Sequence, residues 1–198
     1  MRRILVSLLA VCALAGVLAP IAQATRVQVR VEGRTQTIYG ASEPTLEAGA
    51  TALDALEAAS LAGEFYYHVT QFSFGPFVDQ IGRFGSSAAD GWVYKVNGVS
   101  PDVGAAQYTL QAGDRVLWYW TRFSGPTATP TLRLERLRRG CYRVTTEDAK
   151  GARTAAAGAV LVVDGRRVRT RAGRACIKSH RGLVRAVRSG AVRSNAVP

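Results

Sequence analysis

Two histidines are the side chains in this sequence best suited to acid–base chemistry, and they lie far apart along the chain. His68 stands in an alternating aromatic run, Phe-Tyr-Tyr-His-Val, and His180 stands in a turn-like Ser-His-Arg-Gly stretch. Nucleophilic catalysis of the Ser-His-Asp kind needs one of them as its base. The surroundings of both favour a structural role, since the charged and nucleophilic residues do not converge on either. The sequence therefore predicts no catalytic residue and no enzyme.

The carboxylates give little support for a metal site. Asp90 and Asp102 flank an aromatic stretch and are the best candidates for a cation, but they lack the spacing of a calcium loop. Asp114 follows a glycine just before a strand-like run, where its side chain typically bonds the backbone of a turn. The glycine-containing stretch near Gly82 lacks the lysine of a phosphate-binding loop. We therefore predict no bound metal and no resident cofactor.

The first 24 residues have the pattern of a secretory signal peptide. Two arginines are followed by an apolar run and by Ala-Gln-Ala at residues 22–24, which is a small-x-small cleavage site. The run is interrupted by Pro20 and is shorter than a membrane span. We expect the mature chain to begin at Thr25, to be secreted or associated with the cell envelope, and to have no transmembrane segment.

After removal of this leader, the chain has two cysteines, Cys141 and Cys176. An even pair in an exported chain is typical of a disulfide. A metal site and a catalytic thiol are weaker alternatives, because two cysteines and the nearby His180 fall short of four zinc ligands. We predict a disulfide that closes a loop of about 35 residues, which the chain-entropy model values at roughly 3.5–4 kcal/mol.

The aromatic side chains give the strongest indication of binding. All three tryptophans lie in two runs rich in aromatic and β-branched residues, 92–96 and 115–121, which are bounded by turn dipeptides. Trp92 and Tyr94 share one face of the first run, and Trp118 and Trp120 share one face of the second. Exposed rings would form a platform for a flat ligand or a protein anchor, whereas buried rings would fill the core.

The pattern of residues 25–123 predicts a sheet that holds these two runs. Alternating valines at residues 27–31 indicate a strand, and residues 34–39 return as the second strand of a hairpin. We expect a loop at residues 42–49 and a helix that begins at the N-cap Thr51 and ends at Gly63. Strand-like runs at 65–74 and 77–84 are separated by a Gly-Pro dipeptide. Because one helix cannot cover both faces of such a sheet, we expect part of it to be open to solvent or to a ligand.

Three segments of this half resemble the DUF4430 family: Gly-Trp-Val-Tyr-Lys-Val-Asn-Gly at 91–98, Val-Gly-Ala-Ala-Gln-Tyr at 103–108 and Gly-Asp-Arg-Val-Leu-Trp-Tyr at 113–119. The expected helix, Thr-Ala-Leu-Asp-Ala-Leu at 51–56, also resembles the helix of that family. The family is similar to the C-terminal β-domain of the cobalamin carriers transcobalamin and intrinsic factor. The resemblance covers about residues 26–122, and it implies a β-grasp-like fold, export and a binding role.

The resemblance also implies where a ligand would sit. In corrinoid-binding relatives the contacts come from this pair of strands and the following loop, which here are Trp92, Tyr94 and residues 101–107. Gln107 and Asn97 could supply hydrogen bonds, although a turn with positive φ before Gly98 is the stronger account of Asn97. A corrinoid such as cobalamin is one candidate ligand. The predicted ligand-binding residues are Trp92, Tyr94, Asn97, Gln107, Trp118 and Trp120.

Charge divides the mature chain into two parts. Residues 25–130 carry 7 Lys/Arg and 10 Asp/Glu, whereas residues 131–198 carry 17 Lys/Arg and 4 Asp/Glu. We therefore predict two domains, 25–123 and 131–198, joined by a Ser-, Pro- and Thr-containing linker at 124–130. Short β-runs separated by turn signals, including Asp164-Gly165, indicate that the second domain is a β-sandwich. It weakly resembles immunoglobulin-like or prealbumin-like accessory domains.

Arginines crowd one predicted hairpin of the second domain. On one face of a sheet they could bind an anionic cell-envelope polymer or an acidic lipid surface, although a merely solvated basic surface is the alternative. Nucleic acid is not expected, because the chain is exported and its basic residues are not interleaved with aromatic ones. The predicted polyanion-binding residues are Arg166, Arg167, Arg169, Arg171 and Arg174.

The sequence thus predicts a mainly β protein of the α+β class: a β-grasp-like domain with one helix, followed by a small disulfide-linked β-sandwich. The leading functional hypothesis is non-enzymatic recognition of a small molecule or a surface partner by the aromatic strands. The alternative is an envelope-associated structural or adhesion protein that binds anionic polymers through its arginine-rich domain.

Overall fold

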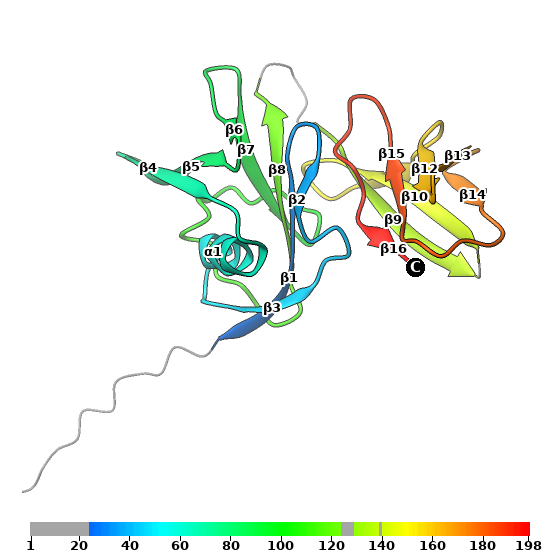
Figure 1. The fold of residues 1–198 in the computed structure, drawn as a ribbon. Coiled ribbons are helices and arrows are strands. Elements are labelled where there is room, and N and C mark those ends of the chain that lie inside the picture. Colours follow the sequence, from blue (N-terminus) through cyan, green and yellow to red (C-terminus); the bar gives the residue numbers. More distant parts are fainter. Residues whose placement is uncertain (1–23, 124–128, 139) are drawn as a thin grey trace, which may run out of the picture.

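The computed structural model describes residues 24–123, 129–138 and 140–198, which form one helix and sixteen strands (Figure 1). The predicted linker lies mostly, and the predicted leader almost entirely, outside the described residues. No helix among the described residues is long and apolar enough to cross a membrane. The elements, in chain order, are β1 (Thr25–Glu32), β2 (Thr37–Tyr39), β3 (Thr45–Ala48), α1 (Ala52–Gly63), β4 (Tyr67–Phe72), β5 (Gly75–Ile81), β6 (Phe84–Gly85), β7 (Asp90–Val96), β8 (Arg115–Arg122), β9 (Thr131–Arg138), β10 (Cys141–Glu147), β11 (Arg153–Ala155), β12 (Val160–Val163), β13 (Arg166–Arg169), β14 (Arg174–Cys176), β15 (Val184–Val187) and β16 (Ala196–Val197).

The first half is built on a mixed sheet, which we call the N-terminal sheet. Its strand order is β2-β1-β8-β7, and β3 pairs with β1. The pairing of β1 with β8 is parallel, and the other pairings are antiparallel. Val27, Val29 and Val31 are completely buried, as their alternation predicts. The expectation of a loop at residues 42–49 was wrong, because Thr45–Ala48 pairs with the start of β1.

The helix α1 covers one face of this sheet. The Thr51 side chain accepts a hydrogen bond from the Asp54 amide and the Asp54 side chain accepts one from the Thr51 amide, which confirms the predicted start. The helix ends at Gly63, and Glu64 takes the left-handed conformation that terminates it. Its buried face packs Leu56 and three alanines against the valines of β1 and the rings of Trp92 and Trp118.

A separate small sheet has the order β4-β5-β6, and its strand β5 lies beside β7. Both predicted strand runs are therefore present, but Gly75 and Pro76 form the start of β5 rather than the turn. The turn lies two positions earlier, at Ser73 and Phe74.

The second half is a β-sandwich of two four-stranded sheets, which we call the C-terminal sandwich. One sheet has the order β11-β10-β14 with β9 on β10, and the other has the order β13-β12-β15-β16. Leu134, Tyr142, Leu161 and Val184 belong to the buried cluster of this half. The predicted tight turn at Asp164-Gly165 joins β12 to β13, with positive φ at both residues.

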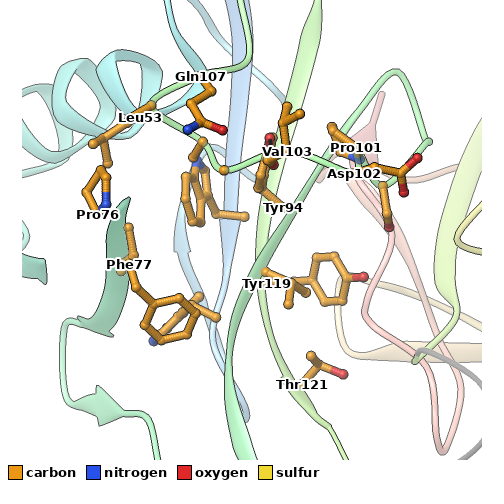
Figure 2. Close-up of a pocket in the computed structure, with 18 of the residues that line it drawn as sticks. Leu53, Pro76, Phe77, Tyr94, Pro101, Asp102, Val103, Gln107, Tyr119 and Thr121 are labelled. Carbon is orange, nitrogen blue, oxygen red and sulfur yellow. Dashed lines mark hydrogen bonds between the residues drawn. The ribbon is translucent and has the colours of Figure 1, made fainter. Parts of the chain in front are cut away.

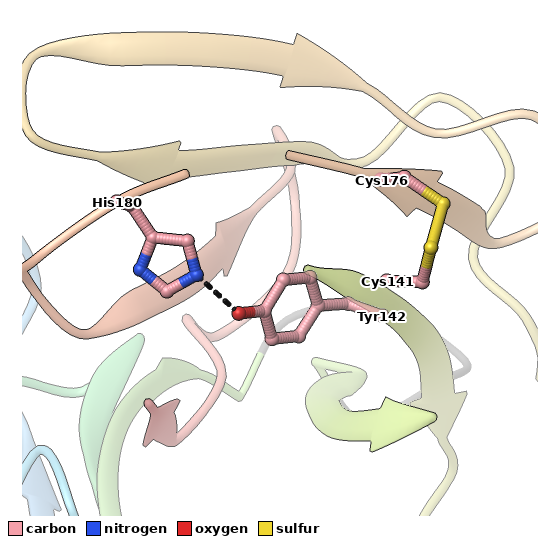
Figure 3. The surroundings of a disulfide bond; sticks show 4 residues. All are labelled: Cys141, Tyr142, Cys176 and His180. Atoms are coloured by element: carbon pink, nitrogen blue, oxygen red, sulfur yellow. Dashed lines mark hydrogen bonds between the residues drawn. A yellow bond between two sulfur atoms is a disulfide. The ribbon is translucent and has the colours of Figure 1, made fainter. Parts of the chain in front are cut away.

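The predicted disulfide is confirmed. Cys141 on β10 and Cys176 on β14 lie directly opposite each other in an antiparallel pair and are bonded (Figure 3). The bond therefore crosslinks two neighbouring strands of one sheet, at positions 35 residues apart along the chain.

The second face of the N-terminal sheet is not open, contrary to the sequence-based expectation. It is covered by the C-terminal sandwich: Leu117 and Tyr119 of β8 form a buried cluster with Val192, and Val93 of β7 packs against it. Lys95, on the same face, donates hydrogen bonds from Nζ to Thr131 Oγ1 and to the backbone oxygens of residues 147 and 148. Alternation along β7 and β8 thus gives one face to the helix and the other to the sandwich.

Charged side chains complete this contact between the two halves. The Glu32 carboxylate of β1 is completely buried and pairs with Arg30, with Arg185 of β15 and with Arg193. Beside it, the Arg133 Nη1 atom lies 2.6 Å from the nearer oxygen of the Glu43 carboxylate. A buried carboxylate that holds guanidinium groups from both halves fixes how the halves meet.

Candidate ligand-binding site

A cavity of about 720 Å³ lies along the outer edge of β7. The segment 100–107 forms one end, α1 and the start of β5 form a second wall, and β7 and β8 form the floor (Figure 2). Four of the six predicted ligand-binding residues line it: Trp92, Tyr94, Gln107 and Trp118.

The tryptophan rings at this cavity are part of its wall rather than an exposed platform. Trp92 and Trp118 are each only 2% exposed. Their indole N–H groups are held by the backbone, because Trp92 Nε1 donates to Phe84 O at 2.8 Å and Trp118 Nε1 donates to Ala52 O at 3.3 Å. These bonds fix the ring orientations and leave the apolar ring surface to line the cavity.

Tyr94 connects the floor of the cavity to the loop above it. Its hydroxyl donates to the Val103 carbonyl oxygen at 2.7 Å, and its ring stacks on Trp118 with 5.3 Å between the centroids. Burial, together with the neighbouring Tyr108, raises the pKa of Tyr94 to about 12. The hydroxyl therefore stays protonated at neutral pH and acts as a hydrogen-bond donor to the loop.

Two predicted ligand-binding residues lie outside the cavity lining. Asn97 takes φ 54° before Gly98, donates from Nδ2 to Asp114 Oδ1 at 2.7 Å and accepts from the Arg115 amide, so it is a turn residue. Trp120 is half-buried elsewhere, with the Arg34 guanidinium 5.3 Å from its ring centroid.

The rim of the cavity is apolar and was not predicted as a site. Phe74 is 68% exposed, Val103 47% and Phe123 44%, and all three line the cavity. Phe77 and Leu53 complete the wall that faces Tyr94 (Figure 2). The sequence signal for this wall was the Phe-rich turn at residues 72–77. This run alone predicts only a hairpin, because its part in the cavity depends on β5 lying beside β7.

The candidate acid–base and cation residues do not converge on the cavity. His68 pairs with Asp79 at 2.7 Å on the small sheet. The Nε2 atom of His180 shares a hydrogen bond with the Tyr142 hydroxyl in the C-terminal sandwich (Figure 3). Asp102 lines the cavity, whereas Asp90 pairs with Arg122. Among the described residues, no group of three or more His, Cys, Asp or Glu side chains is placed to hold a metal ion.

The predicted polyanion-binding arginines lie at one end of the C-terminal sandwich, and all five are exposed. Arg166, Arg167 and Arg169 are on β13, which is an edge strand. Val168 between them packs on the core, so Arg167 and Arg169 project from the outer face. Arg166 donates to the backbone oxygen of Ser179, which holds its side chain along the edge of the sheet.

Comparison with known families gives one match, to the family described as "Domain of unknown function (DUF4430)", over residues 49–122. The model of this family matches these residues, which are about a third of the chain, and the match shows a similarity to DUF4430 there. The predicted resemblance is thus confirmed over most of its range, although the match begins at residue 49 rather than near 26. It contains α1, β7 and β8 and most of the cavity lining. The similarity to the transcobalamin β-domain is not tested by this match and stays a prediction.

Solved structures give a more distant likeness. One is a crystal structure from Ruminococcus gnavus ATCC 29149, described as that of a "putative metal binding protein", with 16% sequence identity and a TM-score of 0.39. The similarity covers 50% of this chain and 97% of that chain. The description concerns that protein alone. A comparison with the curated proteins found no match.

Proposed function

We propose that this chain is a non-enzymatic binding protein whose binding site is the cavity beside β7. The observation that carries the proposal is the cavity itself, which has a volume of about 720 Å³ and mainly apolar and aromatic walls. Ligand sites typically have volumes of roughly 300–1,000 Å³, apolar walls and a few placed polar groups. Polar side chains that line this cavity include those of Gln107, Asp102 and Arg122, with Ser100 and Thr121 beside them.

The ligand that fits these walls is a flat apolar small molecule or an apolar segment of a surface partner. The stacked rings of Tyr94 and Trp118 contribute to the floor, and aromatic faces of this kind stack on flat ligands. The resemblance to cobalamin-carrier domains that the sequence suggests for residues 26–122 makes a corrinoid the first small molecule to test.

The test is a titration of intrinsic tryptophan fluorescence in the whole chain with cobalamin, cobinamide and the apolar dye anilinonaphthalene sulfonate. Because Trp92 and Trp118 line the cavity, an occupant should change the emission until the site is saturated. Free N-acetyltryptophanamide, titrated in parallel, corrects for light absorbed by the corrinoids.

A matched pair of variants assigns the signal to the cavity. Gly104 lines it, and a Cβ added there meets nothing closer than 3.9 Å, so the backbone leaves room for a side chain at this position and Gly104→Phe should obstruct the site. Gly85 on β6 has equally open space but does not line the cavity, which makes Gly85→Phe the control. We expect Gly104→Phe alone to weaken binding by at least about tenfold, the effect of roughly 1.4 kcal/mol.

The outcomes separate the site from the ligand. Saturation by the dye without a response to either corrinoid would keep the cavity as the site and exclude the corrinoid. The absence of a saturable response to all three probes, or equal weakening by the two variants, would contradict the cavity as the binding site.

A second candidate function has its own observation, which is the exposed arginine surface of the C-terminal sandwich. Arg167 and Arg169 project from the outer face of an edge strand, and none of the ion pairs among the described residues includes them. Uncompensated guanidinium groups attract polyanions. We propose that this surface holds the protein to an anionic polymer of the cell envelope.

Retention on immobilised polyphosphate, measured as the salt concentration needed for elution, tests this second function. The double variant Arg167→Glu with Arg169→Glu should elute at clearly lower salt than the unchanged chain. The double variant Arg26→Glu with Arg83→Glu carries the same charge change in the first half and is the control. Equal shifts for both variants would show a response to net charge rather than to this surface.

Both functions assume export of the chain, which rests on the predicted leader. Secretion from a host that processes signal peptides, followed by N-terminal sequencing, should give a mature chain that begins at Thr25. Retention of the unprocessed chain inside the cell would contradict export.

A further inference from the structure

The outer edge of β7 lacks a neighbouring strand among the described residues, because β7 is the last strand in the order β2-β1-β8-β7. Two bonds bracket its ladder with β8: the Asn97 amide donates to Arg115 O, and the Phe123 amide donates to Ala89 O. In an antiparallel pair, hydrogen-bonded and non-bonded residue pairs alternate. The odd-numbered residues of β7 therefore bond to β8.

Trp92 and Tyr94, at the intervening positions, turn their backbone N–H and C=O groups away from β8 and toward the cavity. Among the described residues, no backbone hydrogen bond outside the ladder reaches either residue. The open stretch is bounded by Asp90, whose carbonyl accepts from the Ser87 amide, and by Val96, which is bonded within the turn that follows. It spans about five residues, or roughly 17 Å of extended chain.

The cavity lies on both faces of this edge. On the helix side it is walled by Leu53, Phe77 and Tyr94, and on the sandwich side by Val93 and Tyr119. Figure 2 shows Leu53 and Phe77 across the central strands from Tyr119. A space that accompanies a strand edge and opens to both of its faces has the shape of a missing strand.

We propose that an extended apolar peptide segment of a partner protein adds to the edge of β7 as a further strand. The inference rests on the proposed function, because it names the ligand class of the same cavity. An extended peptide turns N–H and C=O groups toward its neighbour at every second residue, which matches the free groups of Trp92 and Tyr94. Its side chains alternate between two faces, which matches the two-sided apolar cavity. A compact small molecule would cover these backbone groups without pairing them, and a buried unpaired group is unfavourable.

The probe is a capped heptapeptide of alternating valine and phenylalanine with a lysine at each end, titrated against the tryptophan fluorescence of the whole chain. Three further peptides carry backbone N-methyl groups at the valines and lysines, at the phenylalanines, or at both sets. N-methylation at alternate residues leaves one edge of an extended peptide able to pair, whereas methylation of both sets removes all its donors. The protein is left unchanged, so its folding does not enter the comparison.

We expect the parent peptide to bind with saturation and at least one alternately methylated peptide to bind within about threefold of it. The peptide methylated at both sets should bind at least about tenfold more weakly, because two or more hydrogen bonds are lost. Equal binding by the fully methylated peptide would overturn strand addition. If no peptide binds while the apolar dye binds and Gly104→Phe blocks it, the cavity remains a site and the peptide assignment fails. If neither binds, the proposed function fails as well.

Amide hydrogen exchange gives a second readout at individual residues. In the free chain, the amides of Trp92 and Tyr94 should exchange faster than those of Val93 and Lys95, which are bonded to β8. Saturating peptide should slow the first two by at least about tenfold and leave the others unchanged. Protection of Trp92 and Tyr94 that rises with protein concentration in the absence of peptide, together with a dimer in sedimentation, would place a second copy on this edge and overturn the peptide assignment.

Discussion

Lys95 is buried at the contact between the N-terminal sheet and the C-terminal sandwich, where it is 1% exposed. Its Nζ atom donates hydrogen bonds to three protein oxygen atoms there. Burial lowers the pKa of Lys95 from 10.5 to about 8, although the carboxylates of Glu147 and Asp148 oppose this effect. In the unfolded chain the amine keeps its ordinary pKa. Between the two values the unfolded state binds more protons than the folded state, so folding becomes more favourable as the pH rises.

We predict that the free energy of unfolding rises between about pH 8 and pH 10.5 through this residue, and that Lys95→Met removes the rise. Each unit of pKa difference corresponds to about 1.4 kcal/mol, so the difference between the two proteins should change by roughly 2–3 kcal/mol across the window. Urea unfolding of both proteins at several pH values measures it. The tyrosines with raised pKa are common to both proteins and cancel. A constant difference across the window would contradict the prediction.

Glu32 is a second charged side chain that is buried at this contact, and it carries the opposite charge. Its carboxylate is completely buried, and its oxygens accept hydrogen bonds from Arg30, Arg193 and Arg185, and from the Thr37 hydroxyl. Removing the charge of one partner leaves buried guanidinium groups without compensation, which is far more costly than the loss of an exposed pair.

We predict that Glu32→Gln lowers the free energy of unfolding by about 3–5 kcal/mol. Glu135→Gln is the matched control, because Glu135 pairs with Arg143 and Arg153 but its side chain is 39% exposed. Such exposed pairs contribute about 0–1 kcal/mol. Thermal and denaturant unfolding of the two variants measure the difference, and similar losses would count against a buried charge network.

At the residue scale, the sequence predicted what local pattern encodes. The aromatic run marked Trp92, Tyr94 and Trp118, and the turn chemistry of Asn97 was the stronger of its two interpretations. The sequence did not indicate that Lys95 and Glu32 are buried, because the partners that they bind in the C-terminal sandwich lie tens to more than a hundred residues away along the chain. Both looked like the polar positions of strands with one solvated face.

At the scale of elements, the helix α1 is set by its first turn as much as by its apolar face. Thr51 and Asp54 satisfy each other's backbone amides in a capping box. The helix carries Leu53 at the cavity and holds the indole of Trp118 through its first carbonyl, so its start determines the position of one cavity wall.

We predict that Thr51→Ala lowers the free energy of unfolding by about 1 kcal/mol, because the Asp54 amide loses its acceptor. Thr51→Ser retains the hydroxyl and should cost only a few tenths of a kcal/mol. Denaturant unfolding followed by circular dichroism measures both. A loss of the same size in the serine variant would show that the methyl group, rather than the cap, is responsible.

Most elements could be predicted because their signals are local: an N-cap, an alternating run or a positive-φ dipeptide such as Asp164-Gly165. The strand β3 was missed because its residues, Thr-Leu-Glu-Ala, directly follow a proline and are only four, too few for their alternation to stand out. Strands β11 and β16 have three and two residues, too few for a period to appear. The wall formed by Phe74 and Phe77 was missed because it arises from the approach of two sheets.

At the scale of the whole molecule, the two halves share one continuous contact. Leu117, Tyr119 and Val192 form a buried cluster across it, the Ala196 amide donates to Ala41 O, and the Ser100 amide donates to Ala149 O. Charge composition suggested two modules of different surface character. What it could not show is that the acidic half holds basic side chains of its neighbour, Arg185 and Arg193 among them, through Glu32.

We predict that the two halves tumble as one body in solution. Nitrogen-15 relaxation should give one rotational correlation time for amides of the N-terminal sheet and of the C-terminal sandwich. Two shorter, different times would show that the contact opens and that the halves move independently. We expect Glu32→Gln to favour such opening, because it weakens the pairs with Arg185 and Arg193 across the contact.

The predicted domain boundary after residue 123 is a poor place to divide the chain if the first half is to be produced alone. A fragment that ends at residue 123 would expose Leu117 and Tyr119 to solvent. It would also remove Arg185 and Arg193, two of the arginines that pair with Glu32. Transfer of the cavity beside β7 to another protein therefore requires one of two things. Residues 131–198 are kept, or the face of the N-terminal sheet that they cover is redesigned with small polar side chains.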